Sequence, residues 1–341
     1  MAKSQDSNLS ADRKTFPCYY PHDNLSVGTN VASFRMVYDI DQLLHAYTKE
    51  WPPANGRLIH LEGTDGCDGY NPSQAVRYEG ETYHYVRMEP RHDEFAYWSV
   101  PFRRLDGSRW EMEPALPMLH FQDPFVATVD GTLVVGGVSV LGKTNSHVFF
   151  ETILLQGESP ASLATFARSP LNMKDVRLLP LENGRIGIFT RPLGGDGGRG
   201  RIGYLEVDGL EQISAKGMQQ ARLFPTQPVE NQWWGANDVH LLADGAIGVI
   251  GHIAKISDGG RHYYAVAFVF DPREHEIVDG PRIVADRSRF PPYAPKREDL
   301  VDVVFPASLD RERGELLCGV SDSAVGILEI GDPFADYERS R

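Results

Sequence analysis

A repeated pattern of residues runs through most of this chain of 341 residues. In each copy an acidic or amide residue precedes a short apolar run and a turn glycine, and in four of the five copies a polar side chain follows seven residues later. The copies hold Asn71, Gly80 and Arg87; Asp123, Gly131 and Val138; Asp175, Gly184 and Arg191; Asp238, Gly245 and His252; and Asp302, Gly314 and Ser321. Units of roughly 50 to 65 residues with several short strands are typical of propeller blades. The repeat therefore predicts an all-β fold, a five-bladed β-propeller with a short N-terminal extension.

Turn residues divide the rest of the chain into short β-branched and aromatic runs, which are typical of strands. Asp130-Gly131 and Asp244-Gly245 are two-residue hairpin signals, because both turn positions tolerate a positive φ. We expect residues 1–15 to be a disordered tail, residues 16–341 to form one catalytic domain, and residues 41–47 to form a helix. The fifth repeat lacks an outer strand, which we expect residues 31–39 or 57–61 to supply.

The charge balance of the chain excludes several classes of function. The net charge is −13, and no basic run stands out, so nucleic acid and anionic membranes are not expected partners. The three cysteines have no metal-ligand spacing, and their odd number favours free thiols in a reducing compartment. The N-terminus lacks the apolar core of a signal peptide, and no stretch is long enough to span a bilayer. We therefore expect a cytoplasmic protein without a metal.

The repeat also predicts where the functional site lies. In a blade, the start of the innermost strand and the end of the second strand lie near the same face of the propeller. This arrangement predicts two rings of side chains around one funnel. The first ring holds Asn71, Asp123, Asp175, Asp238 and Asp302, and the second holds Arg87, Arg191, His252 and Ser321. The acidic residues could instead cap turns and join neighbouring blades, but Arg and His are awkward structural choices at a crowded axis.

The segment 87–94 is the densest cluster of residues suited to acid–base chemistry. Arginine cations beside carboxylates can keep one acid ionised while burial keeps another protonated. The same segment could instead be a solvated charged loop. Arg191, His252 and Lys255 add cationic positions, which with Arg87 or Arg91 could hold a phosphate. The neighbouring Trp233 and Trp234 could stack on a sugar or simply pack between blades.

Motifs of several enzyme classes do not occur in the sequence. We find no Walker loop, no dinucleotide glycine pattern, no His-Glu-x-x-His and no Gly-x-Ser-x-Gly. A neutral polyol held by Asp, Asn and Arg side chains is the ligand class that fits the remaining residues.

Several short motifs together resemble one known family. They are residues 68–72 (DGYNP), 87–91 (RMEPR), 122–125 (QDPF), 191–192 with 198–203, 234–238 (WGAND), 251–254 (GHIA) and 296–305 (KREDLVDVVF). The set resembles the domain of unknown function 1861, a group that includes the trypanosomatid β-1,2-mannosyltransferase/phosphorylases. The resemblance covers residues 63–326. The order of the motifs is also similar to that of the wider β-mannoside phosphorylases, which are five-bladed propellers.

The resemblance implies an inverting reaction at C1 of a mannosyl group. In phosphorolysis, inorganic phosphate as co-substrate would convert a β-1,2-manno-oligosaccharide into mannose 1-phosphate. In synthesis, mannose 1-phosphate or GDP-mannose would donate to a mannan acceptor. No other cofactor is implied.

The resemblance also implies roles for individual residues. The single catalytic acid of such enzymes is an Asp that works through a sugar hydroxyl, and Asp93 best matches it, with Glu89 and Asp123 as rivals. The phosphate-binding residues implied are Arg191, His252, Arg91 and Lys255. The substrate-binding residues implied are Asn71, Arg87, Glu89, Asp123, Asp238, His240 and Asp302.

The sequence departs from the family pattern at three places. Val138 removes one potential ligand from the second ring, Gly69 stands where Val is expected, and residues 306–308 (PAS) stand where Ser-Gly-Gly is expected. These changes could alter the acceptor preference.

Two other functions remain open at this point. An inverting glycosidase on the same fold would need a second carboxylate to activate water, with Glu89 or Asp322 as candidates. A non-catalytic sugar-binding propeller is also possible, although such proteins usually repeat one site in every blade, whereas the second ring here differs in each.

Overall fold

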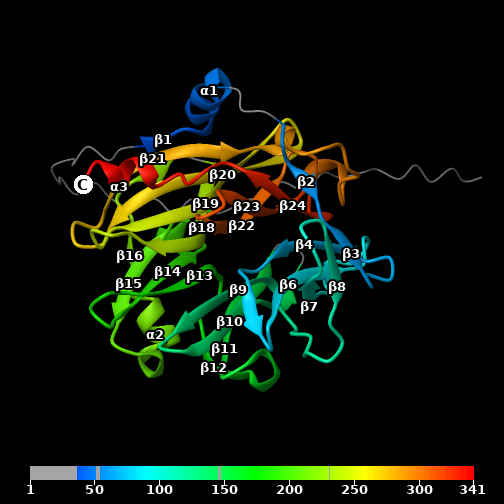
Figure 1. The fold of residues 1–341 in the computed structure, drawn as a ribbon. Helices are drawn as coiled ribbons and strands as arrows, with labels where there is room; N and C mark the ends of the chain where they lie inside the picture. Colours follow the sequence, from blue (N-terminus) through cyan, green and yellow to red (C-terminus); the bar gives the residue numbers. More distant parts are fainter. Residues whose placement is uncertain (1–36, 51–53, 145–146, 230) are drawn as a thin grey trace, which may run out of the picture.

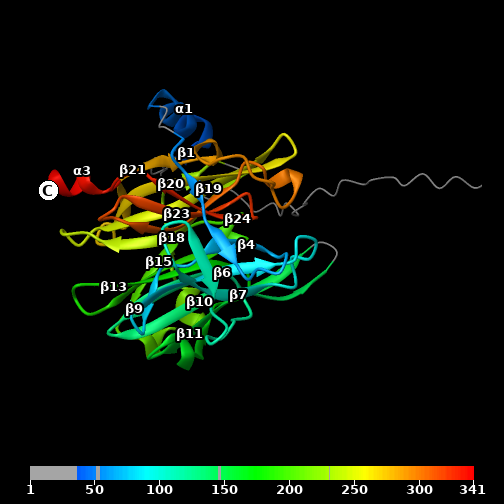
Figure 2. The same ribbon diagram turned by 45° about the vertical axis from the view of Figure 1, so that its right-hand side comes forward.

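The computed structural model describes residues 37–50, 54–144, 147–229 and 231–341. Five β-sheets stand around a common axis (Figures 1 and 2), which confirms the predicted all-β, five-bladed propeller. The expected disordered tail, residues 1–15, lies outside the described residues. None of the helices in the described residues is long and apolar enough to cross a lipid bilayer.

Each blade has its first strand nearest the axis and its later strands farther out. Blade 1 contains β4 (Asp68–Pro72), β6 (Glu81–Glu89), β7 (Trp98–Arg104) and β8 (Arg109–Met112), with β5 (Val76–Tyr78) paired to β6. Blade 2 contains β9 (Gln122–Val129), β10 (Thr132–Lys143), β11 (Val148–Gly157) and β12 (Ala164–Arg168). Blade 3 contains β13 (Met173–Pro180), β14 (Ile186–Pro192), β15 (Gly203–Val207) and β16 (Arg222–Leu223).

The last two blades are built in the same way. Blade 4 contains β18 (Gln232–Leu241), β19 (Ile247–Ser257), β20 (Gly260–Asp271) and β21 (Glu276–Ala285). Blade 5 contains β22 (Val304–Asp310), β23 (Glu315–Val320) and β24 (Ala324–Glu329). Short helices outside the blades include α2 (Ala215–Met218) and α3 (Ala335–Arg339), and short 3₁₀ turns include Pro160–Ser162, Gly195–Gly197, Leu210–Gln212, Arg287–Arg289 and Glu298–Leu300.

N-terminal residues close the ring between blades 5 and 1. The strand β2 (Arg57–Leu58) pairs with β24, and β3 (His60–Glu62) pairs with β8. The expectation that residues 57–61 complete the fifth blade is thus confirmed for residues 57–58, whereas residues 60–61 extend the first blade. The other candidate, residues 31–39, lies mostly outside the described residues, and its end forms β1 (Val37–Tyr38), which pairs with β17 (Gln227–Pro228). The predicted helix is confirmed as α1 (Ile40–Glu50).

Irregularities in the innermost strands explain how polar side chains reach the axis. The pairing register shifts between Tyr70 and Pro72 in β4, and similar shifts occur at Asp123 in β9 and Asp175 in β13. Asn71, Asp123 and Asp175 have φ values of 46°, 50° and 49°. Asn and Asp tolerate this left-handed region better than other non-glycine residues, and an extra residue in a strand redirects its side chain. The repeated acidic or amide position therefore marks a bulge that faces the funnel.

Apolar clusters fill the spaces between neighbouring blades. Between blades 3 and 4, Phe189, Phe224 and Phe270 are almost fully buried and their rings touch. Trp234 is also completely buried, beside Phe268. The packing interpretation of Trp234 is therefore confirmed.

Candidate active site

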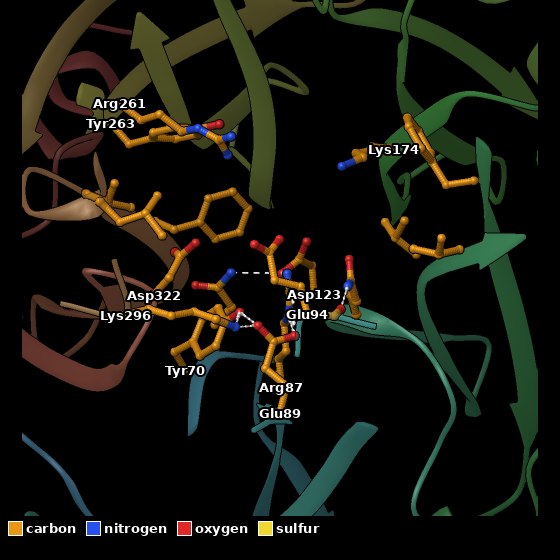
Figure 3. Close-up of a pocket in the computed structure, with 18 of the residues that line it drawn as sticks. Tyr70, Arg87, Glu89, Glu94, Asp123, Lys174, Arg261, Tyr263, Lys296 and Asp322 are labelled. Atoms are coloured by element: carbon orange, nitrogen blue, oxygen red, sulfur yellow. Dashed lines mark hydrogen bonds and ion pairs between the residues drawn. The ribbon is translucent and has the colours of Figure 1, made fainter. Parts of the chain in front are cut away.

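A cavity of about 330 Å³ opens at the end of the propeller where the innermost strands begin. Side chains from all five blades line it (Figure 3). Most of its lining residues are charged or aromatic.

The floor of the cavity contains a chain of alternating charges. Glu89 at the end of β6 is fully buried and accepts hydrogen bonds from Arg87 Nε and Nη2 at 3.1 and 3.0 Å. The other Glu89 oxygen is bonded to Tyr70 Oη and paired with Lys296 Nζ. Burial, together with the neighbouring Arg87 cation, lowers the pKa of Lys296 to about 8. Since both oxygens of Glu89 have partners within the protein, its carboxylate is held in place.

Asp123 is the next member of this series of alternating charges, and it faces the cavity (Figure 3). Its Oδ1 accepts hydrogen bonds from Asn71 Nδ2 at 2.8 Å and Arg87 Nη1 at 3.1 Å. Burial raises the pKa of Asp123, but the Arg87 cation and the Asn71 amide outweigh burial, so the pKa lies below its ordinary value. The side chain is 15% exposed, compared with 0% for Glu89. Asp123 is thus an ionised carboxylate that a ligand can reach.

A second ion cluster lies across blades 3 and 4. Arg191 Nε is 2.5 Å from Asp175 Oδ2, and His252 Nε2 is 3.8 Å from the same oxygen. His252 Nδ1 is 2.8 Å from Asn237 Oδ1, which can only accept, so Nδ1 carries the proton. Burial lowers the pKa of His252 to about 3, so the imidazole is neutral.

A glycine makes room for this cluster. A Cβ atom at Gly235 in β18 would lie 2.6 Å from His252 Cε1 and would also collide with the Asp175 carboxylate. The glycine of the WGAND motif therefore permits the close approach of Asp175 and His252 to the strand.

Further cationic and aromatic groups face the same cavity. Lys174 points into it from blade 3, on the side opposite Asp322 and Lys296 (Figure 3). Burial lowers the pKa of Lys174, and Arg191 lowers it further. Arg261 and Tyr263 approach from blade 4. An anion among these groups would relieve their mutual repulsion, since opposite charges favour the charged form of each cation.

Asp322 is a further carboxyl residue that lines the cavity. Burial raises its pKa above the ordinary value, although Arg87 opposes this shift, and the nearby Asp123 charge raises it further. Asp322 follows Ser321 directly after β23, and both have positive φ values. The cavity therefore holds two carboxyls whose environments move their pKa values in opposite directions.

The structure brings many of the predicted residues to this cavity. Those that line it are Asn71, Arg87, Glu89, Asp123, Asp175, Arg191 and His252. Val138 lines it as well, at the second-ring position of blade 2.

Other predicted residues do not line the cavity. Asp238 is buried deeper, where it accepts hydrogen bonds from Leu309 N and Gln74 Nε2, and His240 lies 3.1 Å from it. Asp302 accepts hydrogen bonds from His262 and Tyr264 at 2.7 and 2.8 Å. These two carboxylates join neighbouring elements, as in the alternative in which acidic residues of the first ring hold the blades together.

Two predicted phosphate ligands have partners elsewhere. Lys255 Nζ pairs with Asp41 and so attaches α1 to β19. Arg91 Nη2 is 2.6 Å from Asp68 Oδ1, and Arg91 Nη1 donates to the Pro295 carbonyl at 2.8 Å. These contacts direct both cations away from the cavity lining.

Asp93, the predicted catalytic acid, lies in the loop after β6. Its side chain is exposed, its Oδ1 accepts a hydrogen bond from Phe95 N at 2.9 Å, and it is not among the residues that line the cavity. The chain turns at residues 90–93, with Asp93 N bonded to the Pro90 carbonyl at 3.0 Å, and this turn carries Asp93 outward. The structure therefore places the rival residues Glu89 and Asp123 in the cavity, but not Asp93.

Several lining residues were not predicted from the sequence. Lys174 directly precedes the repeat residue Asp175, and Tyr70 directly precedes Asn71. Their positions next to repeat residues could have identified them as candidates. Lys296 and Arg261 come from loop and strand positions outside the repeat. Within the described residues, no group of three or more His, Cys, Asp or Glu side chains is placed to hold a metal ion.

The chain is similar to known proteins over most of its length. The family DUF1861, described as a protein of unknown function, matches residues 47–336. No match was found among the curated proteins. The mannose phosphorylase MPT-4 from Leishmania mexicana, solved with a phosphate ion, is 30% identical with a TM-score of 0.80, over 87% of this chain and 94% of that one.

Two other solved structures have the same fold. The GDP-Man-dependent mannosyltransferase MPT-1 from Leishmania mexicana is 23% identical, with a TM-score of 0.77 over 87% of this chain and 96% of that one. The β-1,2-mannobiose phosphorylase from Listeria innocua is 14% identical, with a TM-score of 0.56 over 81% of this chain and 91% of that one. The family match and the likeness to MPT-4 agree with the motifs found in the sequence, and the chain belongs to the DUF1861 family.

Proposed function

We propose that this protein is a carbohydrate-active enzyme, an inverting phosphorylase or mannosyltransferase that acts on β-1,2-linked mannosides. One observation carries the proposal most directly. A single cavity holds a reachable carboxylate, Asp123, together with Lys174, Arg191 and Arg261. The relative with 30% identity, MPT-4, is a mannose phosphorylase solved with phosphate, which supports the same chemistry here.

The cationic side of the cavity is proposed to hold phosphate. Lys174, Arg191 and Arg261 are the candidate ligands, with neutral His252 and the Tyr263 hydroxyl beside them. Arginine can donate two parallel hydrogen bonds to phosphate, and a buried lysine is stabilised in its charged form by an anion. Because the protein carries a net charge of −13, such a local cation cluster is needed to hold an anionic co-substrate.

Asp123 is proposed as the catalytic acid. In phosphorolysis, a phosphate oxygen bonds to C1 while the bond from C1 to the glycosidic oxygen breaks. Asp123 gives its proton to that oxygen directly, or it gives the proton to a sugar hydroxyl whose own proton passes to that oxygen. In synthesis, the acceptor hydroxyl oxygen bonds to C1 and loses its proton to the Asp123 carboxylate, while the bond from C1 to phosphate, or to a nucleoside diphosphate, breaks. General acid–base assistance of this kind contributes roughly 10²- to 10⁴-fold in rate.

The contacts of the three candidate acids support this choice. Asp123 uses only one carboxylate oxygen for contacts with Arg87 and Asn71, whereas both oxygens of Glu89 are bonded to protein groups. Asp93 is exposed outside the cavity. The lowered pKa of Asp123 suits the base needed in synthesis, and a bound phosphate dianion would raise the pKa for the acid role.

An inverting glycosidase is the second candidate function. Asp322 faces the same cavity, and burial raises the pKa of its carboxyl above the ordinary value. In an inverting glycosidase the carboxyl with the raised pKa protonates the leaving group and the ionised carboxylate activates water, so Asp322 would be the acid and Asp123 the base.

A product assay distinguishes the two functions. The protein is incubated with β-1,2-mannotetraose, with and without inorganic phosphate, and the products are separated. A phosphorylase releases mannose 1-phosphate only when phosphate is present. Free mannose in equal amounts in both reactions would instead assign the hydrolase.

A further inference from the structure

The two sides of the cavity differ in chemistry. Cations reach it from blade 1 and from blades 3 to 5, whereas the described residues of blade 2 contribute no cation to it. Beyond Gln122 and Asp123, blade 2 forms an apolar wall of Val138, Val140, Val148 and Phe150. Val138 occupies the position that carries Arg or His in blades 1, 3 and 4, so the wall begins at the deepest ring of side chains. A ligand that fills the cavity therefore has its charged part toward blades 3 to 5 and an uncharged part against blade 2.

The apolar wall continues out of the cavity onto the surface. Phe95 and Val148 line the cavity but are also 42% and 44% exposed. Lys143 Nζ lies 4.2 Å from the centre of the Phe95 ring, and Lys143 is the strand partner of Val148. Phe150 lies on the same face of β11 as Val148 and also lines the cavity. We call the exposed surface formed by Phe95 and Val148 the blade-2 rim.

Neighbouring contacts hold the blade-2 rim in place. Tyr97 Oη accepts a hydrogen bond from Val140 N at 2.8 Å, which ties the loop after β6 to β10. Gln122 Nε2 donates to the Glu94 carbonyl at 3.1 Å, directly before Phe95. The stem of the Phe95 loop is thus bonded to blade 2 on both sides of the ring.

The size of the cavity requires such an outer surface for a long ligand. A volume of about 330 Å³ is at the lower end of the range for small-molecule sites. Phosphate and the first sugar rings fill that space, so later rings of an oligosaccharide must lie outside. Sugar rings present C–H groups on one face, and aromatic rings are favourable partners for such apolar faces.

We propose that the blade-2 rim is an acceptor subsite on which the outer sugars of a manno-oligosaccharide lie, with Phe95 as the stacking platform. This inference rests on the proposed function. Continuity with the cavity favours a sugar chain over a second copy of the protein, because a second copy would cover the mouth through which substrate enters. The net charge of −13 also opposes self-association, whereas a neutral sugar chain meets no repulsion.

Chain-length dependence tests the subsite. The ratio of kcat/KM for β-1,2-mannotetraose to that for β-1,2-mannobiose is measured in phosphorolysis for wild-type protein, Phe95→Ala and Phe95→Leu. We expect the ratio to fall by about five- to tenfold in both variants, since each removes the ring. Phe95→Leu keeps an apolar side chain and so guards against a loss caused by misfolding. Phe95→Tyr keeps the ring and should keep the ratio.

Tyr293→Ala is the matched control. Tyr293 is another exposed aromatic residue, 48% exposed, but it does not line the active-site cavity. Its loss should leave the ratio unchanged. If wild-type protein turns over both sugars and Phe95→Ala keeps the wild-type ratio, the subsite is overturned and the proposed function stands.

Other outcomes separate the remaining possibilities. If wild-type protein forms no mannose 1-phosphate from either sugar, the proposed function fails and the subsite fails with it. If sedimentation shows a wild-type dimer that Phe95→Ala converts to monomer, the rim belongs to an interface between copies and the subsite is overturned.

Discussion

Individual charged residues in the cavity floor depend on one another. Lys296, Glu89, Arg87 and Asp123 form a continuous series of ion pairs, and the side chains of Lys296 and Glu89 are almost completely buried. A buried ion pair costs desolvation energy, and removal of one partner leaves the other charge uncompensated. Glu89 is the member with the most partners, so it positions Arg87 against Asp123.

Glu89→Gln should therefore strongly destabilise the protein. The change keeps the shape of the side chain but leaves the buried Lys296 cation without its carboxylate partner and Arg87 with Asp123 alone, which costs about 3–5 kcal/mol. The free energy of unfolding in urea measures the loss. Glu94→Gln is the control, because the pair of Glu94 with Arg297 is partly exposed and worth about 0–1 kcal/mol. Equal losses in the two variants would show that Glu89 does not hold the buried series together.

Two buried histidines make the stability depend on pH. Burial lowers the pKa of His84 to about 4 and that of His252 to about 3, below the ordinary value of 6.5. The unfolded chain thus binds more protons than the folded protein below pH 6.5, and the free energy of unfolding falls as the pH decreases toward these values. Each histidine should cost about 2 kcal/mol at pH 5, from 1.36 kcal/mol per pH unit.

His84→Asn tests this pH dependence away from the cavity. His84 Nδ1 lies 2.9 Å from the Ser73 carbonyl, and an Asn amide can also donate to that oxygen. We expect the decrease in unfolding free energy between pH 7 and pH 5 to shrink by about 2 kcal/mol in the variant. An unchanged decrease would mean that His84 is already protonated, or equally protonated in both states.

At the scale of elements, the strand that closes the ring explains one unusual glycine. A Cβ atom at Gly69 in β4 would collide with Leu61 Cδ1 of β3. Leu61 packs in the cluster between blades 5 and 1, with Val86 and Ile327. Gly69 therefore makes space for the closing strand.

Gly69→Val should destabilise the protein through this contact. Overpacking of this kind costs about 1–3 kcal/mol. Leu61→Ala in the same chain should restore part of the loss, because the two side chains compete for one space. A double-mutant cycle on thermal unfolding measures the coupling. Strictly additive effects of the two substitutions would contradict the proposed packing.

The innermost strands also show how far a repeat predicts a site. Asn71, Asp123 and Asp175 occur at equivalent bulges, and they line the cavity as the repeat indicates. In β18 the register shift lies at Asn237, between Ala236 and Asp238, and in β22 it lies between Pro306 and Ser308. The repeat residues of blades 4 and 5 therefore do not occupy positions equivalent to those of blades 1 to 3. For this reason Asp238 and Asp302 bond to protein groups and do not line the cavity.

For the whole molecule, the number of blades, the ring closure and much of the second ring followed from the sequence. The cavity itself could not be predicted completely, because it combines strands with loops that lie outside the repeat. Lys296 reaches the floor from the loop before β22. Arg91 and Asp93 belong to a segment rich in charged residues, but the number of charges does not show whether their side chains point into the cavity or away from it. The contacts of Arg91 with Asp68 and Pro295 turn this segment outward.

The central claim is that Asp123 exchanges a proton with the sugar in a phosphate-dependent reaction. The most direct measurement is the rate at which wild-type protein, Asp123→Asn and Asp93→Asn form mannose 1-phosphate from β-1,2-mannotetraose and inorganic phosphate. We predict a loss of roughly 10²- to 10⁴-fold for Asp123→Asn. Asp93→Asn should remain within about twofold of wild type, because a surface substitution leaves the cavity intact. Full activity in Asp123→Asn, or loss of activity in Asp93→Asn alone, would contradict the account.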